Sequence, residues 1–465
     1  MTATYATGNL ATEYLKEQLR LQILGNSLEI VPDRMHLIQT QLSKRDRLAA
    51  LLEGELNFHG ENSTYASHDL HAFAAKFPPQ LPRAFIRGLT NPGDVVLDPM
   101  MGSGTAVVEA LLAGRRAIGY DIDPLAVRLC RVKTTPIDVD TVVQAGLRVM
   151  AQANALLAEA EYLDKTLSDR FDRESKTFID YWFLPATQRE IMSLVLAIES
   201  LPQGLEREFL ELTLSSIIVT KSGGVSLARD LAHSRPHLDK TKTPRNALVQ
   251  FNARLRKNIN SIAELHTNGT HAIVQSGDAR RLPLVDETVD LVVTSPPYAN
   301  AIDYMRAHKF SLVWFGKPIS ELSELGADYI GSERVGSSPA TVLPVRPESI
   351  IARLAELDTK KAAVLRKYFC EMAQVIKEMH RVLRPDCAAV IVVGSSVMRG
   401  IDVQTHLCLA DIGAHVGFDV VGVAERKLDR NKRMMPARFG RKSDSMIEQR
   451  MHEEYVIGFL KRSKT

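Results

Sequence analysis

A glycine-rich loop at residues 98–105 is the first group of residues whose types and spacing could do chemistry. It reads Asp98-Pro99-Met100-Met101-Gly102-Ser103-Gly104-Thr105 and follows the apolar run 94–97. Glycines after a parallel strand allow a tight turn and let a ligand approach the main chain, and the amides at the start of the next helix favour an anion. Asp121 ends the next apolar run and is placed to accept both hydroxyls of a ribose. These residues predict a cofactor that contains a nucleoside.

Two kinds of cofactor, a dinucleotide and S-adenosylmethionine, fit the spacing of this loop. Val107 stands where a dinucleotide-binding loop usually has its third glycine. Asp98 would repel a pyrophosphate but suits the amino group of a methionine moiety. The methyl donor is therefore favoured, with the dinucleotide as the alternative.

A proline-rich loop at the end of the apolar run 290–294 forms the second group. It reads Thr294-Ser295-Pro296-Pro297-Tyr298. The two prolines remove two backbone donors and fix two φ angles, so the loop is stiff and its carbonyls point one way. Such a set of acceptors can hold the two hydrogens of an exocyclic amine, and Tyr298 offers a face on which a planar base can stack. The alternative is a plain turn that ends a strand.

Five motifs together resemble one enzyme family. FPPQL, DPMMGSGT, GYDIDP, SGDAR and TSPPY, with the continuation AIDYMRAHKFSLVWFG, are similar to the S-adenosylmethionine-dependent amino-group DNA methyltransferases of the TSPPY type. The resemblance covers about 68–133, 271–316 and 376–400. It implies an α/β fold with a Rossmann-like class I methyltransferase sheet, S-adenosyl-L-methionine as the cofactor and double-stranded DNA as the substrate.

The resemblance also implies roles for individual residues. Ser295, Pro296, Pro297 and Tyr298 would form the catalytic loop. In the cofactor-binding set, Phe77 and Pro78 would lie beside the methionine or adenine, and Asp98, Gly102 and Gly104 would hold the methionine end. Asp121 would bind the ribose and Asp278 the adenine amine. The set is completed by Pro99, Thr105, Ile122 and Ala279. Outside this context, the stretch around Asp278 reads equally well as a turn.

The target atom is the least determined part of the prediction. Methylation at cytosine C5 needs a cysteine nucleophile, which that family carries in a Pro-Cys dipeptide, and no Pro-Cys occurs in the chain. Ser295 in the first position of its loop resembles the cytosine-N4 enzymes, whereas Asp or Asn is commoner in adenine-N6 enzymes. Cytosine N4 of a flipped-out base is favoured over adenine N6. Two further functions stay open, a tRNA or rRNA N-methyltransferase and a non-catalytic DNA-specificity subunit.

A parallel sheet must position these loops, and the apolar runs supply one. Strands are predicted at 94–97, 116–120, 271–275, 290–294, 388–394 and 454–460, and helices at 106–114, 125–132 and 367–383. Helical patterns at 141–163, from 187, at 205–220 and at 245–265 interrupt the alternation. We therefore expect an N-terminal helical arm at 1–67 and a catalytic methyltransferase domain at 68–134 and 269–465. A mostly helical insertion at 135–268 is a candidate DNA-recognition domain. A second, loop-like insertion is expected at 316–350.

Basic residues gather in two places that suit phosphate contacts. Residues 221–257 hold nine Lys/Arg and two acids. A second cluster lies at 426–442 and begins with Arg426. The predicted DNA-binding residues are Lys221, Arg229, Arg235, Lys240, Lys242, Arg245 and, in the second cluster, Arg433. The alternative for the first cluster is a solvated helix face.

The composition excludes several classes of protein. The chain has 465 residues, 45% of them hydrophobic, 24% charged, and a net charge of +3, so neither a disordered chain nor a wholly basic coating protein is expected. The four cysteines have no CxxC pair and the histidine pairs lack further ligands, so no metal site is predicted. We expect a cytoplasmic protein without a membrane span. A cognate restriction endonuclease would be a separate chain, and the oligomeric state stays open.

Overall fold

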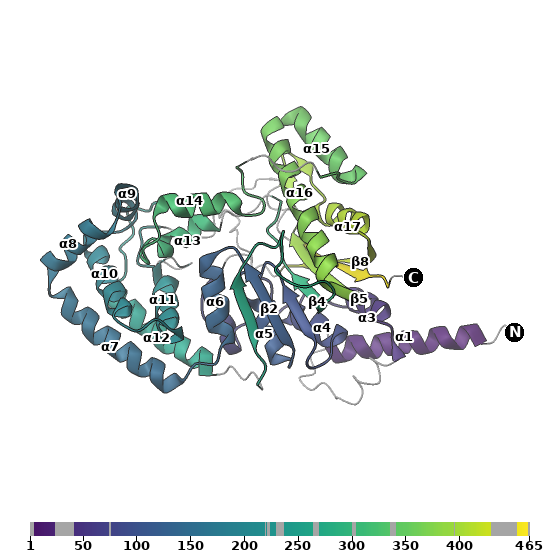
Figure 1. Ribbon diagram of the computed structural model, residues 1–465, viewed down its shortest axis with the longest axis horizontal. Helices are drawn as coiled ribbons and strands as arrows, with labels where there is room; N and C mark the ends of the chain where they lie inside the picture. Colours follow the sequence, from purple (N-terminus) through teal and green to yellow (C-terminus); the bar gives the residue numbers. More distant parts are fainter. Residues whose placement is uncertain are drawn as a thin grey trace.

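A computed structural model describes residues 4–23, 41–73, 76–218, 220, 224–228, 237–263, 269–299, 304–334, 341–394, 396–428 and 453–463. In this part of the chain a seven-stranded sheet runs in the order β3-β2-β1-β4-β5-β9-β8 (Figure 1). Its strands are β1 (Val95–Asp98), β2 (Arg116–Asp121), β3 (Ala272–Ser276), β4 (Val289–Thr294), β5 (Leu383–Gly394), β8 (Phe418–Lys427) and β9 (Glu453–Lys461).

The directions of these strands identify the fold. The strands β3, β2, β1, β4 and β5 are parallel, and β9 is antiparallel to both of its neighbours, β5 and β8. A parallel sheet whose strand order reverses between β1 and β4, with one antiparallel strand near its edge, is the Rossmann-like class I methyltransferase arrangement. The predicted fold class is confirmed.

Alternate side chains of the central strands face two separate cores, as the twofold repeat of a strand requires. Val96 of β1 packs with the helices α3 (Lys44–Leu52), α4 (Gln80–Leu89) and α5 (Thr105–Leu112) on one face. Leu97 packs on the other face, against the core formed with α15 (Val345–Leu357), α16 (Thr359–Val382) and α17 (Thr405–Val416). Strand β4 is buried along its whole length, which is typical of a parallel strand covered on both faces.

A helical region lies beside the sheet, on the left of Figure 1. It comprises α7 (Val139–Leu157), α8 (Ala160–Arg170), α9 (Arg173–Trp182), α10 (Pro185–Glu199), α11 (Leu205–Ile218) and α12 (Ala247–Ala263). Its core also takes in residues of α6 (Pro124–Thr134), α13 (Met305–Leu312) and α14 (Ile319–Asp328). Because the core is shared in this way, the division of the chain into a catalytic domain and an insertion stays a prediction.

Two expectations about the elements are corrected. The single helix expected at 141–163 is two, because Glu159 leaves the helical conformation at φ −100° and ψ 64°. The second insertion, expected to be loop-like, contains α14 and the start of α15. Its Gly, Ser and Pro residues are divided equally between the stretch joining those helices and the helices with their immediate flanks. The composition of the whole segment therefore hid two amphipathic runs.

Several elements were not predicted at all. They are the 3-10 turn Ala66–Asp69, the helices α4, α9, α13 and α17, the short strands β6 (Val397–Met398) and β7 (Ile401–Asp402), and the strand β8. The helix α1 (Thr4–Ile23) falls within the expected N-terminal helical arm. Among the described helices, none has the length and apolar character needed to cross a bilayer.

Candidate active site

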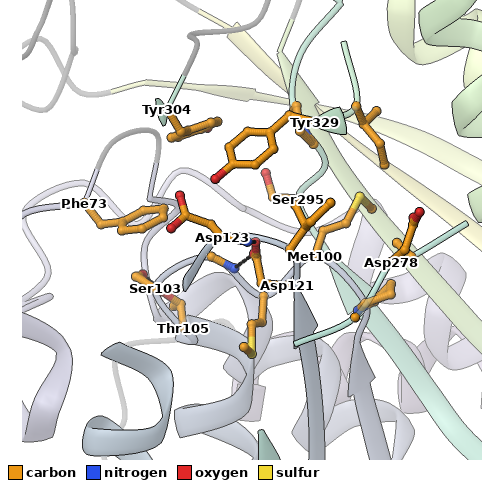
Figure 2. A pocket seen from close by; sticks show the side chains of 18 of the residues that line it. Phe73, Met100, Ser103, Thr105, Asp121, Asp123, Asp278, Ser295, Tyr304 and Tyr329 are labelled. Carbon is orange, nitrogen blue, oxygen red and sulfur yellow. Dashed lines mark hydrogen bonds between the residues drawn. The ribbon is translucent and has the colours of Figure 1, made fainter. Parts of the chain in front are cut away.

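A cavity of about 850 Å³, its open mouth included, lies at the carboxyl ends of β1, β2, β3 and β4 (Figure 2). This is the edge at which parallel sheets bind their ligands. The cavity brings together most of the predicted site residues: Phe77, Pro99, Gly102, Thr105, Asp121, Ile122, Asp278, Ala279, Ser295 and Pro297. Pro78, Asp98, Gly104, Pro296 and Tyr298 do not line it.

The glycine loop and the acid that follows β2 form one hydrogen-bonded unit. The Gly102 amide donates to Oδ2 of Asp121 at 2.8 Å, and the Asp123 amide donates to Oδ1 at 2.9 Å. Gly104 has φ +75°, and a Cβ there would collide with the side chain of Cys130 on α6. The loop therefore lies tight against α6 and holds the Asp121 carboxylate at the centre of the cavity. We call residues 99–105 and 121–123 the floor.

A buried lysine supports the loop from behind. Nζ of Lys133 donates to the Ser103 carbonyl at 2.6 Å, and the side chain is 1% exposed. The Ser67 hydroxyl donates to the Lys133 carbonyl at 2.8 Å, which ties the segment before α4 to α6. Burial lowers the pKa of Lys133 well below its usual value. Sequence reasoning missed this lysine, because its position in α6 has no motif around it.

Asp98 lies beneath the floor rather than in the cavity. Its Oδ1 accepts from the Thr294 hydroxyl at 2.7 Å and from the Met100 amide at 3.2 Å, so it joins the glycine loop to the end of β4. Burial raises the pKa of Asp98 to about 7, although both hydrogen bonds favour the ionised form. Asp98 therefore does not reach the cavity to contact the methionine amino group directly. An electrostatic attraction between the two groups over a longer distance stays a proposal.

The other carboxylates of the floor differ in their pKa values. Burial, assisted by the charge of Asp123, raises the pKa of Asp121 to about 6. Asp123 is also buried, but its pair with Nδ1 of His308 and its own amide partners outweigh burial and lower its pKa. Asp121 and Asp123 place two carboxyl groups in the floor, and Asp98 places a third beneath it. That environment suits a positively charged sulfonium and ammonium, so the residues fit S-adenosylmethionine.

Asp278, at the far end of the cavity, is held by a neighbouring arginine. Nε of Arg280 lies 2.9 and 3.0 Å from the two carboxylate oxygens of Asp278. The same guanidinium donates to Glu371 of α16 at 2.8 Å and to the Asp328 carbonyl at 3.1 Å. Arg280 therefore connects Asp278 to the last residue of α14. The sequence motif contained Arg280, but no role was predicted for it.

The predicted catalytic loop enters the cavity through Ser295 and Pro297. Figure 2 shows Ser295 between Asp121 of the floor and Tyr329 above it. Tyr298 turns away from the lining, and its hydroxyl donates to Oε1 of Glu454 on β9 at 2.8 Å. Burial, then the Glu454 charge, raises the pKa of Tyr298 well above its usual value. The predicted stacking of a base on this ring stays a proposal.

Aromatic side chains that the sequence analysis missed cover the cavity. Phe73, Tyr304, Tyr329 and the aliphatic Ile330 also line it, and we call these four residues the roof. The ring of Phe73 borders Gly102 of the floor. The rings of Phe73 and Tyr304 are stacked with centroids 5.9 Å apart. Tyr304 stands in the stretch AIDYMRAHKF, which carried part of the family resemblance, so its position could have been noticed. Tyr329 follows α14, in the segment that was expected to be a loop.

The predicted DNA-binding residues divide into three groups. Lys221, Arg229, Arg235 and Arg433 lie outside the described residues. Lys240 and Arg245 are exposed, which a phosphate contact requires. Nζ of Lys242 donates to the carbonyls of Ser226 and Ala228 at 2.6 and 2.7 Å, an arrangement that stabilises its own loop.

Arg426 and the histidines have partners within the protein. Arg426, the first residue of the second basic cluster, is 3% exposed and pairs with Glu454, so it does not grip DNA. His68 contacts Glu109 at 2.8 Å, and His71 contacts the Ala72 carbonyl and the Ser215 hydroxyl. No group of three or more metal-binding side chains is found in the described part of the chain.

Comparison with known proteins finds similarity to DNA methyltransferases. The profile of the family described as DNA methylase matches residues 44–131. The type II methyltransferase M.MvaI of Kocuria varians is 25% identical over 409 residues, which are 82% of this chain and 87% of that protein. M.AvaI of Nostoc is 24% identical over 363 residues, 70% of this chain and 73% of its own. M.MjaI of Methanocaldococcus jannaschii is 49% identical over 49 residues, 10% of this chain and 16% of its own.

Among solved structures, an S-adenosylmethionine-dependent methyltransferase of Methanosarcina mazei is similar, with 12% sequence identity and a TM-score of 0.30. The match covers 82% of this chain and 97% of that chain. The fold assignment rests on the strand order and not on this superposition. Strand order, motifs and sequence relatives agree. The chain is therefore similar to the amino-group DNA methyltransferases, a family that uses S-adenosyl-L-methionine to methylate cytosine N4 or adenine N6.

Proposed function

We propose that the protein is a site-specific DNA methyltransferase that acts on the N4 amine of a flipped-out cytosine. The observation that carries this proposal is that Ser295 lies in the same cavity as Asp121, with the roof above it (Figure 2). A cofactor seated on the floor and a base entering beneath the roof would then meet at Ser295. Ser295 rather than Asp or Asn at this position supports cytosine over adenine.

Bound S-adenosyl-L-methionine supplies an electrophilic methyl group on a sulfonium. The chain itself has to hold the amine, orient it and keep water out. In the proposal the Ser295 hydroxyl and the Pro296 carbonyl accept the two hydrogens of the amine, which draws the nitrogen towards tetrahedral geometry and aims its lone pair. The two prolines hold these acceptors still, so the alignment is already present before the base arrives.

The remaining cofactor contacts are proposed by the same reasoning. Asp121 would accept the ribose hydroxyls, and Ile122 would lie against the adenine. Asp278 would accept the adenine amine, while Phe77 and Pro78 would border the cofactor. Gly102, Gly104, Pro99 and Thr105 would shape the methionine end, and Asp98 would favour its positive charges from beneath.

The biological setting follows from the relatives and is also a proposal. Because the similar proteins are named type II methyltransferases, we propose that this chain protects cytoplasmic double-stranded DNA from a cognate restriction endonuclease carried on a separate chain. Lys240 and Arg245 are the described candidates for contacts to the DNA phosphates.

The test is transfer of tritiated methyl groups to unmethylated genomic DNA, followed by mass spectrometry of the nucleosides. We expect N4-methylcytosine from the wild type and a loss of about 100-fold in Ser295→Ala. Ser200→Ala, which changes an exposed serine at the end of α10, is the matched control and should leave the rate unchanged.

Each different result selects a different function. N6-methyladenine would keep the enzyme class and correct the target. Label in RNA but not in DNA would move the protein to the RNA N-methyltransferases. Bound cofactor without transfer to either nucleic acid would indicate a DNA-specificity subunit.

A further inference from the structure

The hydroxyl of Tyr298 is anchored by a residue far away in the sequence. It donates to Oε1 of Glu454 at 2.8 Å, across a separation of 156 residues. Glu454 is 7% exposed and belongs to β9, the antiparallel strand next to β5. An ionised acceptor makes this a strong hydrogen bond, and burial removes the water that would compete for it. The catalytic loop is therefore fastened at its last residue.

Glu454 is in turn held by Arg426, so its carboxylate cannot move freely with the Tyr298 hydroxyl. Arg426 of β8 is the register partner of Glu454, and the two side chains form a buried ion pair. Nε of Arg426 also donates to the Leu56 carbonyl at 3.0 Å, in the segment after α3. A buried carboxylate between two donors has its position fixed on both sides.

The ring of Tyr298 is fixed as well as its hydroxyl. A Cβ added to Gly394, the last residue of β5, would come within 2.5–3.0 Å of three ring carbons, so the ring lies directly on this glycine. Gly394 is the register partner of Glu454. Gly394, Glu454 and Arg426 thus form one row across three adjacent strands, and Tyr298 lies along the start of that row.

We propose that Glu454, held by Arg426, is a positioning residue that sets the orientation of the Tyr298 ring and, through it, the aim of the Ser295-Pro296 acceptors. The inference rests on the proposed function, since it concerns the alignment of the target amine. A hydrogen bond at the ring tip and a backbone surface beneath the ring restrict both tilt and rotation. Neither Glu454 nor Arg426 touches the cavity, so their effect passes through Tyr298.

Single-turnover methyl transfer to unmethylated genomic DNA tests this role. Tyr298→Phe keeps the ring and removes its hydrogen bond, and Glu454→Ala removes the acceptor. We expect each to slow transfer about tenfold while the affinity for S-adenosylmethionine stays within twofold. Glu454→Gln keeps an oxygen acceptor and should recover most of the rate. Glu453→Ala, which truncates the neighbouring strand residue, is the matched control and should transfer at the wild-type rate.

A double-mutant cycle separates positioning from general support of the fold. If Glu454 acts through the Tyr298 hydroxyl, the double variant Tyr298→Phe/Glu454→Ala should be no slower than either single variant. Thermal unfolding is followed in parallel, and Tyr298→Phe should melt close to the wild type. The proposal would be overturned if the fold-losses in rate of the two single variants multiplied in the double variant. It would also be overturned if Tyr298→Phe transferred methyl groups at the wild-type rate.

The wild-type reaction distinguishes the two levels of inference. If the wild type methylates DNA and Tyr298→Phe is equally fast, the positioning role fails and the proposed function stands. If the wild type transfers no methyl group to DNA, the proposed function fails and the positioning role fails with it.

Discussion

The floor and the roof of the cavity are assembled from very different parts of the chain. The floor comes from one continuous unit, β1-α5-β2, together with the turn into α6. The roof comes from Phe73, Tyr304 and the turn after α14, which meet because the helical region packs beside the sheet. We therefore extend the proposed function: the floor serves the cofactor and the roof serves the base. The two parts can then change independently.

The largest expected effect is in the floor. Asp121→Ala removes the carboxylate placed to accept the ribose hydroxyls and also releases the Gly102 amide. We expect the affinity for S-adenosylmethionine to fall about 100-fold, since two charge-assisted hydrogen bonds are lost. Isothermal titration calorimetry measures it. An affinity within threefold of wild type would show that the floor does not hold the ribose through this acid.

The next effect is in the roof and should leave the floor alone. Tyr304→Ala removes the ring that stacks on Phe73. We expect single-turnover transfer to DNA to slow about 30-fold, because the base loses a wall of its pocket, with cofactor affinity within twofold. Tyr304→Phe is the conservative control and should stay near the wild-type rate. A large loss of cofactor affinity in Tyr304→Ala would abolish the distinction between floor and roof.

The pH dependence of cofactor binding tests the floor without a substitution. The pKa of Asp121 is raised to about 6, chiefly by burial, and the ionised form is the one that can accept both hydroxyls. The affinity for S-adenosylmethionine should therefore be highest above this pKa. It should fall as the pH drops through this pKa, by about tenfold between pH 7 and pH 5. Calorimetry in buffers of different ionisation heat would also detect the proton released on binding at pH 5.5. A flat profile from pH 5 to pH 7.5 would contradict this assignment.

The smallest effect is expected where the two parts are joined. Arg280 contacts Asp278 at one end and the Asp328 carbonyl, next to Tyr329, at the other. Arg280→Ala should lower both the cofactor affinity and the transfer rate by about fivefold. The exposed neighbour Arg281 provides the matched control, Arg281→Ala, which should change neither quantity. A change in one quantity alone would assign Arg280 to the floor or to the roof.

The floor could be read from the sequence because its chemistry is local. The loop from Asp98 to Thr105 and the acid Asp121 belong to neighbouring strands, so their spacing alone predicts that they meet. Asp278 and Ser295 needed the additional expectation that parallel strands end at one edge. The fold class followed from the same alternation of strands and helices.

The roof and the anchor of Tyr298 depend on long-range packing, which leaves no local pattern. Tyr329 follows a helix hidden in a segment rich in Gly, Ser and Pro. Arg426 stood in a run of basic residues and was grouped with DNA contacts, although β8 turns its side chain inwards to Glu454. The strand β8 itself, half-buried along much of its length, lacked the continuous apolar run of β4 or β5. Charge and composition describe a segment but do not say which of its residues face inwards.

The distance along the chain between Tyr298 and Glu454 also sets an order of events during synthesis. The cofactor floor and the catalytic loop leave the ribosome first, and Glu454 follows 156 residues later. At the usual rates of translation, this interval is about 10–30 s. During it the nascent chain already contains every element of the floor, whereas the tyrosine has no acceptor for its hydroxyl. A growing chain should therefore complete the floor before it can align the predicted catalytic loop, and methyl transfer should reach its full rate only when β9 is complete.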